Sequence, residues 1–244
     1  MITLSNMKEL ILSKRMEAVA SLVPEHLKTV ADIGCDHAYV SIKLKQDEKA
    51  DRIIAMDLRK GPLEIARQNV IKYEMSDHIE LRLSDGMDKL SPKEADAIVI
   101  AGMGGLLMID ILIRGSNILQ CDKPPALILQ PQSDIREVRS FLYDNSYHIT
   151  KEKMIYEDGK YYTAILATPG TDKPYDMEED WIYGKYNIDT QDDILIKYLT
   201  KERSNLEEIL NSLKGNASDK ASKRSEEIEL LLKNNKAAME RCRL

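Results

Sequence analysis

The sequence predicts an α/β protein in which a mostly parallel sheet ends in an antiparallel hairpin and is followed by a pair of long helices. Three observations predict this fold. Short apolar runs alternate with segments of helical periodicity over about the first 150 residues, a pattern typical of βαβ units. An Asp-Gly pair then separates two strand-like runs, and two heptad seams follow near the C-terminal end.

Five short runs rich in β-branched or apolar residues are the expected parallel strands: Thr29–Ile33, Arg52–Asp57, Ile79–Leu83, Ala97–Ala101 and Ala126–Gln130. Helical spacing lies between them in Pro62–Tyr73, Leu106–Ile118 and Ser133–Asn145. Pro62 suits a first helical turn, and Ser133 is expected to cap the helix that it begins.

The antiparallel hairpin is predicted from Tyr147–Tyr156 and Lys160–Thr168, which flank Glu157-Asp158-Gly159. Asp-Gly between two strand-like runs is a strong hairpin signal. With the five earlier runs, the sheet is therefore expected to have seven strands.

The C-terminal part has a different organisation, and we expect a domain of residues 1–170 followed by a linker and helical hairpin of residues 171–244. Residues 169–184 hold two prolines, two glycines and five acids, which is typical of a linker. Two seams with a/d spacing follow, and both contain a polar residue: Leu195, Leu199, Glu202, Leu206, Ile209 and Leu213, then Ile228, Leu231, Asn235, Ala238 and Cys242. Gly215-Asn216 separates them, which predicts an antiparallel coiled-coil hairpin; the alternative is a helix pair that simply packs on the domain.

Composition excludes several classes of protein. The 244 residues carry 35 Lys+Arg and 41 Asp+Glu, a net charge of −6 that excludes a basic chromatin-type protein. Three cysteines without a CxxC pair argue against a zinc cluster or a disulfide framework. Charged residues interrupt the N-terminal apolar positions, and the longest uncharged run, Ala97–Ile109, is too short for a membrane span. We therefore expect a cytoplasmic protein with no metal site and no membrane contact.

The most informative motif is the segment Val30–Val40, in which an apolar strand meets an acid and then a glycine two residues later. A first strand of this kind holds a nucleotide-like ligand at the carboxyl edge of a parallel sheet, where a glycine allows close approach. The dinucleotide pattern G-x-G-x-x-G is absent, and the segment is closer to D-x-G-x-G-x-G of S-adenosylmethionine-dependent methyltransferases. Asp36 and Ala38 replace its second and third glycines, and the alternative is an ordinary strand–turn–helix.

Polar residues also follow the other strands. Asp57 ends the second strand and is placed to accept hydrogen bonds from ribose hydroxyls. Asp85-Gly86 follows the third strand, where a carboxylate can accept from an adenine amine, although a plain turn is an equal alternative. The Gly-rich turn Ile100–Gly105 exposes backbone amides, and Gln130-Pro131-Gln132 offers two amide side chains to a nucleobase edge.

Together these motifs resemble the bacterial tRNA (adenine-22-N1)-methyltransferase family over nearly the whole chain. The matching strings are Leu12-Ser13-Lys14-Arg15, Asp32-Ile33-Gly34-Cys35-Asp36-His37-Ala38-Tyr39, Lys60-Gly61-Pro62-Leu63, Ser84-Asp85-Gly86, Ile100–Gly105, Gln130–Gln132 and Glu157-Asp158-Gly159-Lys160-Tyr161-Tyr162. The resemblance implies a Rossmann-like class I methyltransferase domain that transfers a methyl group from S-adenosyl-L-methionine to N1 of an adenosine in tRNA.

The resemblance also implies which residues form the site. The expected cofactor-binding residues are Arg15, Asp32, Gly34, Cys35, Asp36, His37, Asp57, Leu58, Asp85, Gly86, Ala101 and Gly102. Arg15 is expected at the methionyl carboxylate, although a solvated charge on the helix face is an alternative. The residues expected at the target base are Met103, Gly104, Gln130, Pro131 and Gln132.

Other functions stay open from the residues alone: a small-molecule methyltransferase on the same scaffold, or a non-catalytic S-adenosylmethionine-binding protein. A monomer and a weak homodimer both fit a hairpin with a/d seams. Residues 1–170 carry 22 basic and 25 acidic side chains, and residues 171–244 carry 13 basic and 16 acidic side chains. Each part therefore has a net charge of −3. tRNA is therefore expected to bind local basic patches, with candidates at Lys14/Arg15, Arg136/Arg139 and Lys220/Lys223/Arg224.

Overall fold

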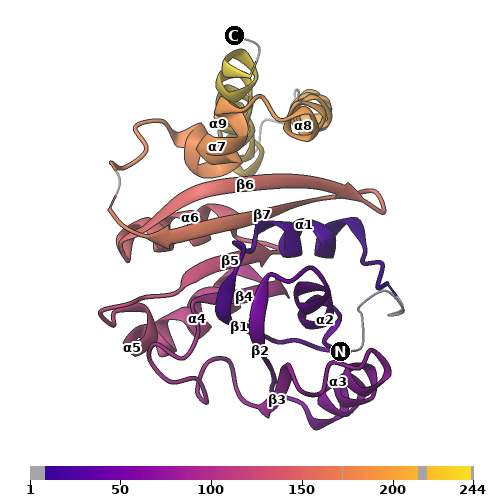
Figure 1. Ribbon diagram of the computed structural model, residues 1–244. Coiled ribbons are helices and arrows are strands. Elements are labelled where there is room, and N and C mark those ends of the chain that lie inside the picture. Colours follow the sequence, from indigo (N-terminus) through magenta and orange to yellow (C-terminus); the bar gives the residue numbers. More distant parts are fainter. Residues whose placement is uncertain (1–8, 172, 214–218, 243–244) are drawn as a thin grey trace. The chain divides into compact units, whose positions relative to one another are not determined.

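A computed structural model describes residues 9–171, 173–213 and 219–242 (Figure 1). The chain divides into two compact units. The first comprises residues 1–151 with 155–172, and the second comprises residues 152–154 with 173–244.

A seven-stranded sheet has the strand order β3-β2-β1-β4-β5-β7-β6, which confirms the predicted fold class. Its strands are β1 (Leu27–Ile33), β2 (Ala50–Asp57), β3 (Ile79–Leu83), β4 (Ala97–Met103), β5 (Ala126–Pro131), β6 (Tyr147–Glu157) and β7 (Lys160–Pro169). β1 pairs in parallel with both β2 and β4. β2 pairs in parallel with β3, and β4 pairs in parallel with β5. β5 and β7 pair antiparallel. Connections leave β1 and β4 in opposite directions, and such a switch point opens a crevice at the carboxyl ends of the strands.

In the described part of the chain, six helices cover the two faces of the sheet. One apolar cluster joins one face to α1 (Lys14–Leu22), α2 (Tyr39–Gln46) and α3 (Lys60–Lys72). The other cluster joins the opposite face to α4 (Gly105–Arg114), α5 (Ser116–Leu119) and α6 (Ile135–Asp144). Neighbouring strand residues such as Val30 and Ala31 belong to different clusters. The central strands are therefore buried on both sides, which explains their continuous apolar runs.

Two local predictions are wrong, and in both places a tertiary contact decides the structure. Ser133 does not cap α6, which follows Asp134, because its hydroxyl accepts from the Gly105 amide and donates to the Asp134 carboxylate. The helix predicted over Leu106–Ile118 divides at Gly115. A Cβ at Gly115 would lie 2.0 Å from Cε of Met87, so the side chain of Met87 packs directly against the backbone there.

The second unit is helical. It contains a π-helical turn, η2 (Asp180–Gly184), and the helices α7 (Lys185–Asp189), α8 (Asp193–Leu213) and α9 (Asp219–Arg241). The predicted linker is thus too long, because residues 178–184 are helical and the side chains of Asp180 and Tyr183 are buried. Leu199 near the start of α8 accepts a hydrogen bond from Asn235 near the end of α9, so the two helices run antiparallel. Their coiled-coil packing stays a prediction, and the Gly215-Asn216 turn lies outside the described residues.

The polar residues of the two seams meet each other. Asn235 donates to the Leu199 carbonyl and to Glu202 Oε2, both at 2.9 Å. The hydroxyls of Tyr183 and Tyr198 donate to the two oxygens of the same carboxylate at 2.7 and 2.8 Å. A buried polar group is satisfied in one alignment alone, so this network fixes the register of α8 against α9.

No helix in the described part of the chain is both long enough and apolar enough to span a membrane.

Replacing Glu202 with Leu should destabilise the second unit by about 3–5 kcal/mol, because three donors in or near its interior lose their shared acceptor. Glu202→Gln should cost less, about 1–2 kcal/mol, since it keeps one acceptor oxygen. Trp181, the single tryptophan, lies in this unit, so its fluorescence during urea unfolding follows the unit directly.

The matched control is Glu208→Leu, at an exposed position of the same helix. Equal unfolding midpoints for Glu202→Leu and Glu208→Leu would contradict a structural role for the network.

Candidate active site

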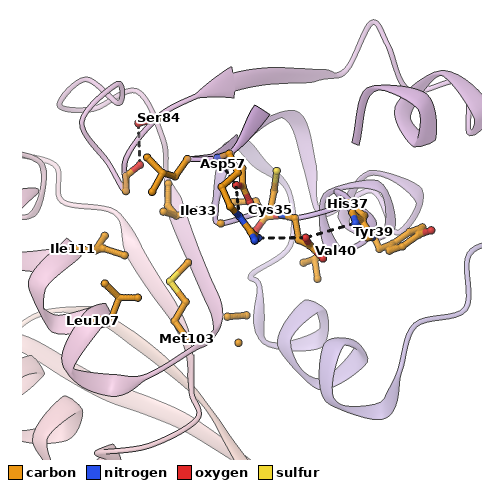
Figure 2. A pocket seen from close by; sticks show the side chains of 18 of the residues that line it. Ile33, Cys35, His37, Tyr39, Val40, Asp57, Ser84, Met103, Leu107 and Ile111 are labelled. Atoms are coloured by element: carbon orange, nitrogen blue, oxygen red, sulfur yellow. Dashed lines mark hydrogen bonds and ion pairs between the residues drawn. The ribbon is translucent and has the colours of Figure 1, made fainter. Parts of the chain in front are cut away.

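A cavity of about 620 Å³ opens at the carboxyl ends of the central strands, at the switch point between β1 and β4. The segments that follow β1, β2, β3 and β4 form most of its wall, and α1 adds Arg15. Figure 2 shows Asp57 and Cys35 on one side of this space and Met103, Leu107 and Ile111 on the other. The motifs at four strand ends are therefore brought to one place.

The loop after β1 follows the path of a glycine-rich loop while carrying side chains. Gly34, Asp36 and Ala38 all have left-handed backbone, with φ of 72°, 49° and 60°. Glycine adopts this conformation without strain at Gly34, where a Cβ would lie 2.1 Å from Cε of Met103 and would displace the end of that side chain. Non-glycine residues in this conformation cost about 1 kcal/mol each. Asp36 and Ala38 thus keep the backbone of the D-x-G-x-G-x-G pattern at a small conformational cost.

Asp57 joins the loops around the cavity. Its side chain is 5% exposed, and its two oxygens accept from the backbone amides of Asp36 at 3.1 Å and Arg59 at 2.8 Å. Its carbonyl oxygen accepts from the Ser84 amide at 2.9 Å. One residue therefore fixes the loops that follow β1, β2 and β3, and its carboxylate is held rigidly at the wall of the cavity.

Asp32 is the second buried carboxylate of the site. It is 4% exposed, and its Oδ2 accepts from the Ser41 hydroxyl at 2.5 Å. Burial raises the pKa of Asp32 to about 6. The hydrogen bond from Ser41 lowers this pKa in part, and the charge of Asp57 raises it further. Burial and the neighbouring carboxylates, that of Asp32 first, also raise the pKa of the Cys35 thiol, which leaves it protonated and argues against a nucleophilic role.

The guanidinium of Arg15 also lines the cavity. Nη1 of Arg15 donates to Oε1 of Gln130 at 2.9 Å, and the Gly102 amide donates to the same oxygen at 3.2 Å. Nε2 of Gln130 donates to the Pro131 carbonyl, so this fully buried side chain is engaged at both ends. Gly102 has φ of 76°, and a Cβ there would lie 3.4 Å from the Arg15 guanidinium.

Asp85 lies at the cavity mouth in an ion pair. Nη2 of Arg114 is 3.1 Å from Asp85 Oδ1, and the same guanidinium reaches Asp88 and Asp110. The carboxylate of Asp85 is therefore paired with a cation of α4.

All twelve residues predicted to bind the cofactor line this cavity. Of the five predicted at the target base, Met103 and Gln132 line it, whereas Gly104, Gln130 and Pro131 do not. Gly104 precedes α4, and Gln130 and Pro131 are buried at the end of β5. The roles of these residues stay predictions.

Eight further lining residues were not among the predicted site residues: Met16, Ile33, Tyr39, Val40, Arg59, Ser84, Leu107 and Ile111. Most of them adjoin predicted residues. Leu107 and Ile111 are four residues apart on α4, so extending the Gly-rich turn into one helix face would have found them.

The described residues contain no group of three or more His, Cys, Asp or Glu side chains that could hold a metal ion. The lining includes carboxylates, glycine turns, one apolar wall, His37 and the guanidinium groups of Arg15 and Arg59.

The strand order and the position of this cavity define a Rossmann-like methyltransferase. The family model described as a methyltransferase domain matches residues 12–165.

Comparison with known proteins then identifies the family. The chain is 35% identical over 211 residues to tRNA (adenine(22)-N(1))-methyltransferase of Bacillus subtilis, which covers 85% of this chain and 87% of that protein. The crystal structure of the B. subtilis m1A22 tRNA methyltransferase TrmK matches with a TM-score of 0.83 at 30% identity, over 95% of this chain and 100% of the other. M. capricolum TrmK, solved with S-adenosyl-homocysteine, matches with a TM-score of 0.80 at 29% identity, over 95% of this chain and 99% of the other. The chain belongs to the tRNA (adenine(22)-N(1))-methyltransferase family.

The raised pKa of Asp32 predicts that Asp32→Asn stabilises the ligand-free protein at neutral pH. A folded-state pKa of about 6, against 3.8 ordinarily, means that ionised Asp32 disfavours folding. At about 1.4 kcal/mol per pKa unit, the difference reaches about 3 kcal/mol. The contribution of Asp32 to the free energy of unfolding of the wild type is fully present below about pH 4. This contribution is lost as the pH rises through about 6.

Calorimetric unfolding of the ligand-free protein should therefore show that Asp32→Asn is more stable than the wild type at pH 7.5 and equally stable at pH 4. Asp77→Asn, at an exposed position, is the control. A gain of the same size at both pH values would contradict the burial argument.

Proposed function

We propose that this chain transfers a methyl group from S-adenosyl-L-methionine to N1 of adenosine 22 in bacterial tRNA. The observation that carries the proposal is its membership of the family, with 35% identity to the B. subtilis enzyme over 85% of the chain. The cavity supports it, because its residues match the chemistry of the methyl donor group by group.

The nucleoside half of S-adenosyl-L-methionine fits the side of the cavity that follows β2 and β3. Asp57 is a buried, fixed acceptor suited to the ribose hydroxyls. Leu58, 62% exposed, offers an apolar surface to an adenine face. Asp85 and Gly86 border the same side, where a carboxylate suits an exocyclic amine.

The amino-acid half fits between Asp32 and Arg15. A buried carboxylate suits an ammonium group, and a guanidinium suits a carboxylate. Gly34 and Gly102 line this stretch without a Cβ, so a ligand can approach the backbone closely. The M. capricolum relative, solved with S-adenosyl-homocysteine, supports this choice of ligand.

The chemistry requires alignment more than acid–base groups. When bound, the donor supplies an electrophilic methyl group on a positively charged sulfur. Adenine N1 attacks with an in-plane lone pair, so the N1–C bond forms as the C–S bond breaks and the positive charge passes to the adenine. No proton must leave N1 first, and therefore the protein needs no general base and acts by positioning.

The target adenine is expected beside Met103 and Gln132. Gln132 is exposed, and its backbone amide donates to the Met103 carbonyl, so the two residues are held together at the rim. The side-chain amide of Gln132 can form hydrogen bonds with a nucleobase edge. Because N1 lies on the pairing edge of adenine, the base must be exposed before transfer.

Residues 1–170 are proposed as the catalytic domain and residues 171–244 as an element that assists tRNA binding. Lys220, Lys223 and Arg224 are exposed on α9 and suit phosphate contacts. Arg139 leaves the candidate list because only 1% of it is exposed, while Arg136 remains exposed on α6. A tRNA-modifying enzyme of this kind is expected in the cytoplasm.

The decisive test is in vitro methylation of unmodified bacterial tRNA with labelled S-adenosyl-L-methionine, followed by mass spectrometry that maps the product to a position. 1-Methyladenosine at position 22 is expected, and a tRNA with guanosine at position 22 should stay unlabelled. No transfer to any tRNA would refute the proposal, and transfer to small acceptors alone would favour a small-molecule enzyme.

Replacing Asp57 with Ala should abolish S-adenosyl-homocysteine binding measured by calorimetry, because the ribose acceptor and the side-chain anchor of the loops after β1 and β2 are lost together. Asp57→Asn keeps one acceptor oxygen and should weaken binding at least tenfold while retaining more of the fold. Asp77→Ala is the control at an exposed position. Wild-type affinity in Asp57→Asn would contradict the role of this carboxylate.

The affinity for tRNA should fall as salt rises, because local cations replace counterions on the phosphates. The triple variant Lys220→Ala, Lys223→Ala, Arg224→Ala should bind tRNA more weakly and with a shallower salt slope, while S-adenosyl-homocysteine binding stays unchanged.

The charge-matched control is the triple variant Lys28→Ala, Lys93→Ala, Lys123→Ala. These lysines lie near the amino ends of β1, β4 and β5, away from the cavity edge. Equal losses of tRNA affinity in the two triple variants would contradict a specific role for the α9 cations.

A further inference from the structure

We propose that Tyr162 and Gln130 are positioning residues that hold the Arg15 guanidinium at the cavity edge, ready for an anionic group. The inference rests on the proposed function, because the anion concerned is the carboxylate of the methionyl end of the methyl donor. It gives a role to the Glu157–Tyr162 motif, which the proposed reaction does not otherwise use.

Two neutral groups contact the guanidinium. The Tyr162 ring, on β7, lies with its centroid 5.1 Å from Cζ of Arg15, which is cation–π distance. Gln130 Oε1 accepts from Nη1 at 2.9 Å. The same oxygen accepts from the Gly102 amide, so the guanidinium is tied to the turn that borders the cavity.

The backbone that carries Arg15 is fixed by the same hairpin. Glu157 Oε1 accepts from the Lys14 amide at 2.6 Å, one residue before Arg15. The hydroxyl of Ser13 caps the helix by accepting from the Met16 amide. The end of β6 thus holds the first turn of α1, and Tyr162 on β7 holds the Arg15 side chain.

The charge of Arg15 is not neutralised by these contacts. Within the described ranges, Arg15 forms no ion pair with a carboxylate. Arg59, the other arginine of the cavity lining, lies 3.9 Å from Asp36 and 3.8 Å from Asp57. An amide oxygen and an aromatic ring orient a guanidinium and leave most of its five donors available, whereas a carboxylate would occupy them.

The test compares two ligands that differ by one group: S-adenosyl-homocysteine and its decarboxylated analogue, S-adenosyl-3-thiopropylamine. Their affinities for the full chain, measured by calorimetry, give a ratio that reports recognition of the carboxylate. Arg15→Ala should bring this ratio near one. Tyr162→Leu should lower it about fivefold, while affinity for the decarboxylated ligand stays within about twofold of the wild type.

Conservative and matched variants separate positioning from damage to the fold. Tyr162→Phe keeps the ring and should retain the wild-type ratio. Tyr156→Leu, which removes an exposed ring of the same hairpin that pairs with Tyr161, should also retain it. Gln130→Glu places a carboxylate beside Arg15 and should lower the ratio at least as far as Tyr162→Leu.

The proposal is overturned if Tyr162→Leu weakens both ligands equally, or if it lowers the ratio by the same factor in the Arg15→Ala background. It is also overturned if Arg15→Ala leaves the ratio unchanged. Each result is separable from failure of the proposed function, which is judged by methylation of tRNA by the wild-type chain.

Discussion

The geometry of this site depends on the Asp57 carboxylate and on the two hydrogen bonds that it accepts from backbone amides. A buried carboxylate is expensive to desolvate, and amides from the loops after β1 and β2 compensate it. One of those bonds holds Asp36 within the left-handed stretch of the loop, and the Met56 carbonyl accepts from the amides of Gly34 and Cys35. The wall of the cavity is therefore set before any ligand arrives.

This arrangement has an energetic cost in the ligand-free protein. Asp32 lies near Asp57, its pKa is raised to about 6, and two non-glycine residues keep strained backbone in the same loop. Sites that hold such costs are preorganised for a ligand that relieves them. A ligand that brings an ammonium group and ribose hydroxyls to these two carboxylates supplies the compensation. Catalysis by positioning requires this rigidity, because the methyl group must be aligned with N1 and sulfur.

The sequence predicted the sheet well because burial on both faces leaves a direct signal in the chain. Ile79–Leu83 matches β3 fully, and the other strands differ by at most two residues at either end. Predictions failed where a distant residue decides the outcome. Ser133 bonds Gly105, and Met87 packs on Gly115, and neither contact leaves a local pattern. Arg139 looked like a surface cation because charge alone does not reveal burial.

The candidate site shows the same difference between features that local sequence patterns predict and features that distant residues decide. Strand-end motifs found the cavity lining, because the carboxyl ends of parallel strands must share one edge. They could not show which residues support that lining. Arg15, Gln130 and Tyr162 come from a helix and two strands far apart in the chain, and a side chain such as Gln130, placed at the target base from its motif, is buried behind the wall.

The strings that identify the family are therefore of two kinds. Some, such as Asp32–Gly34 and Asp57, present groups to the cavity, and their proposed roles can be inferred from residue type and spacing. Others meet at one guanidinium: the first helix supplies Arg15, β5 supplies Gln130 and β7 supplies Tyr162. A cation that must stay available to an anionic ligand cannot be fixed by a carboxylate, so neutral partners must hold it from several directions. That requirement explains why a hairpin outside the cavity carries a motif as specific as those at the strand ends.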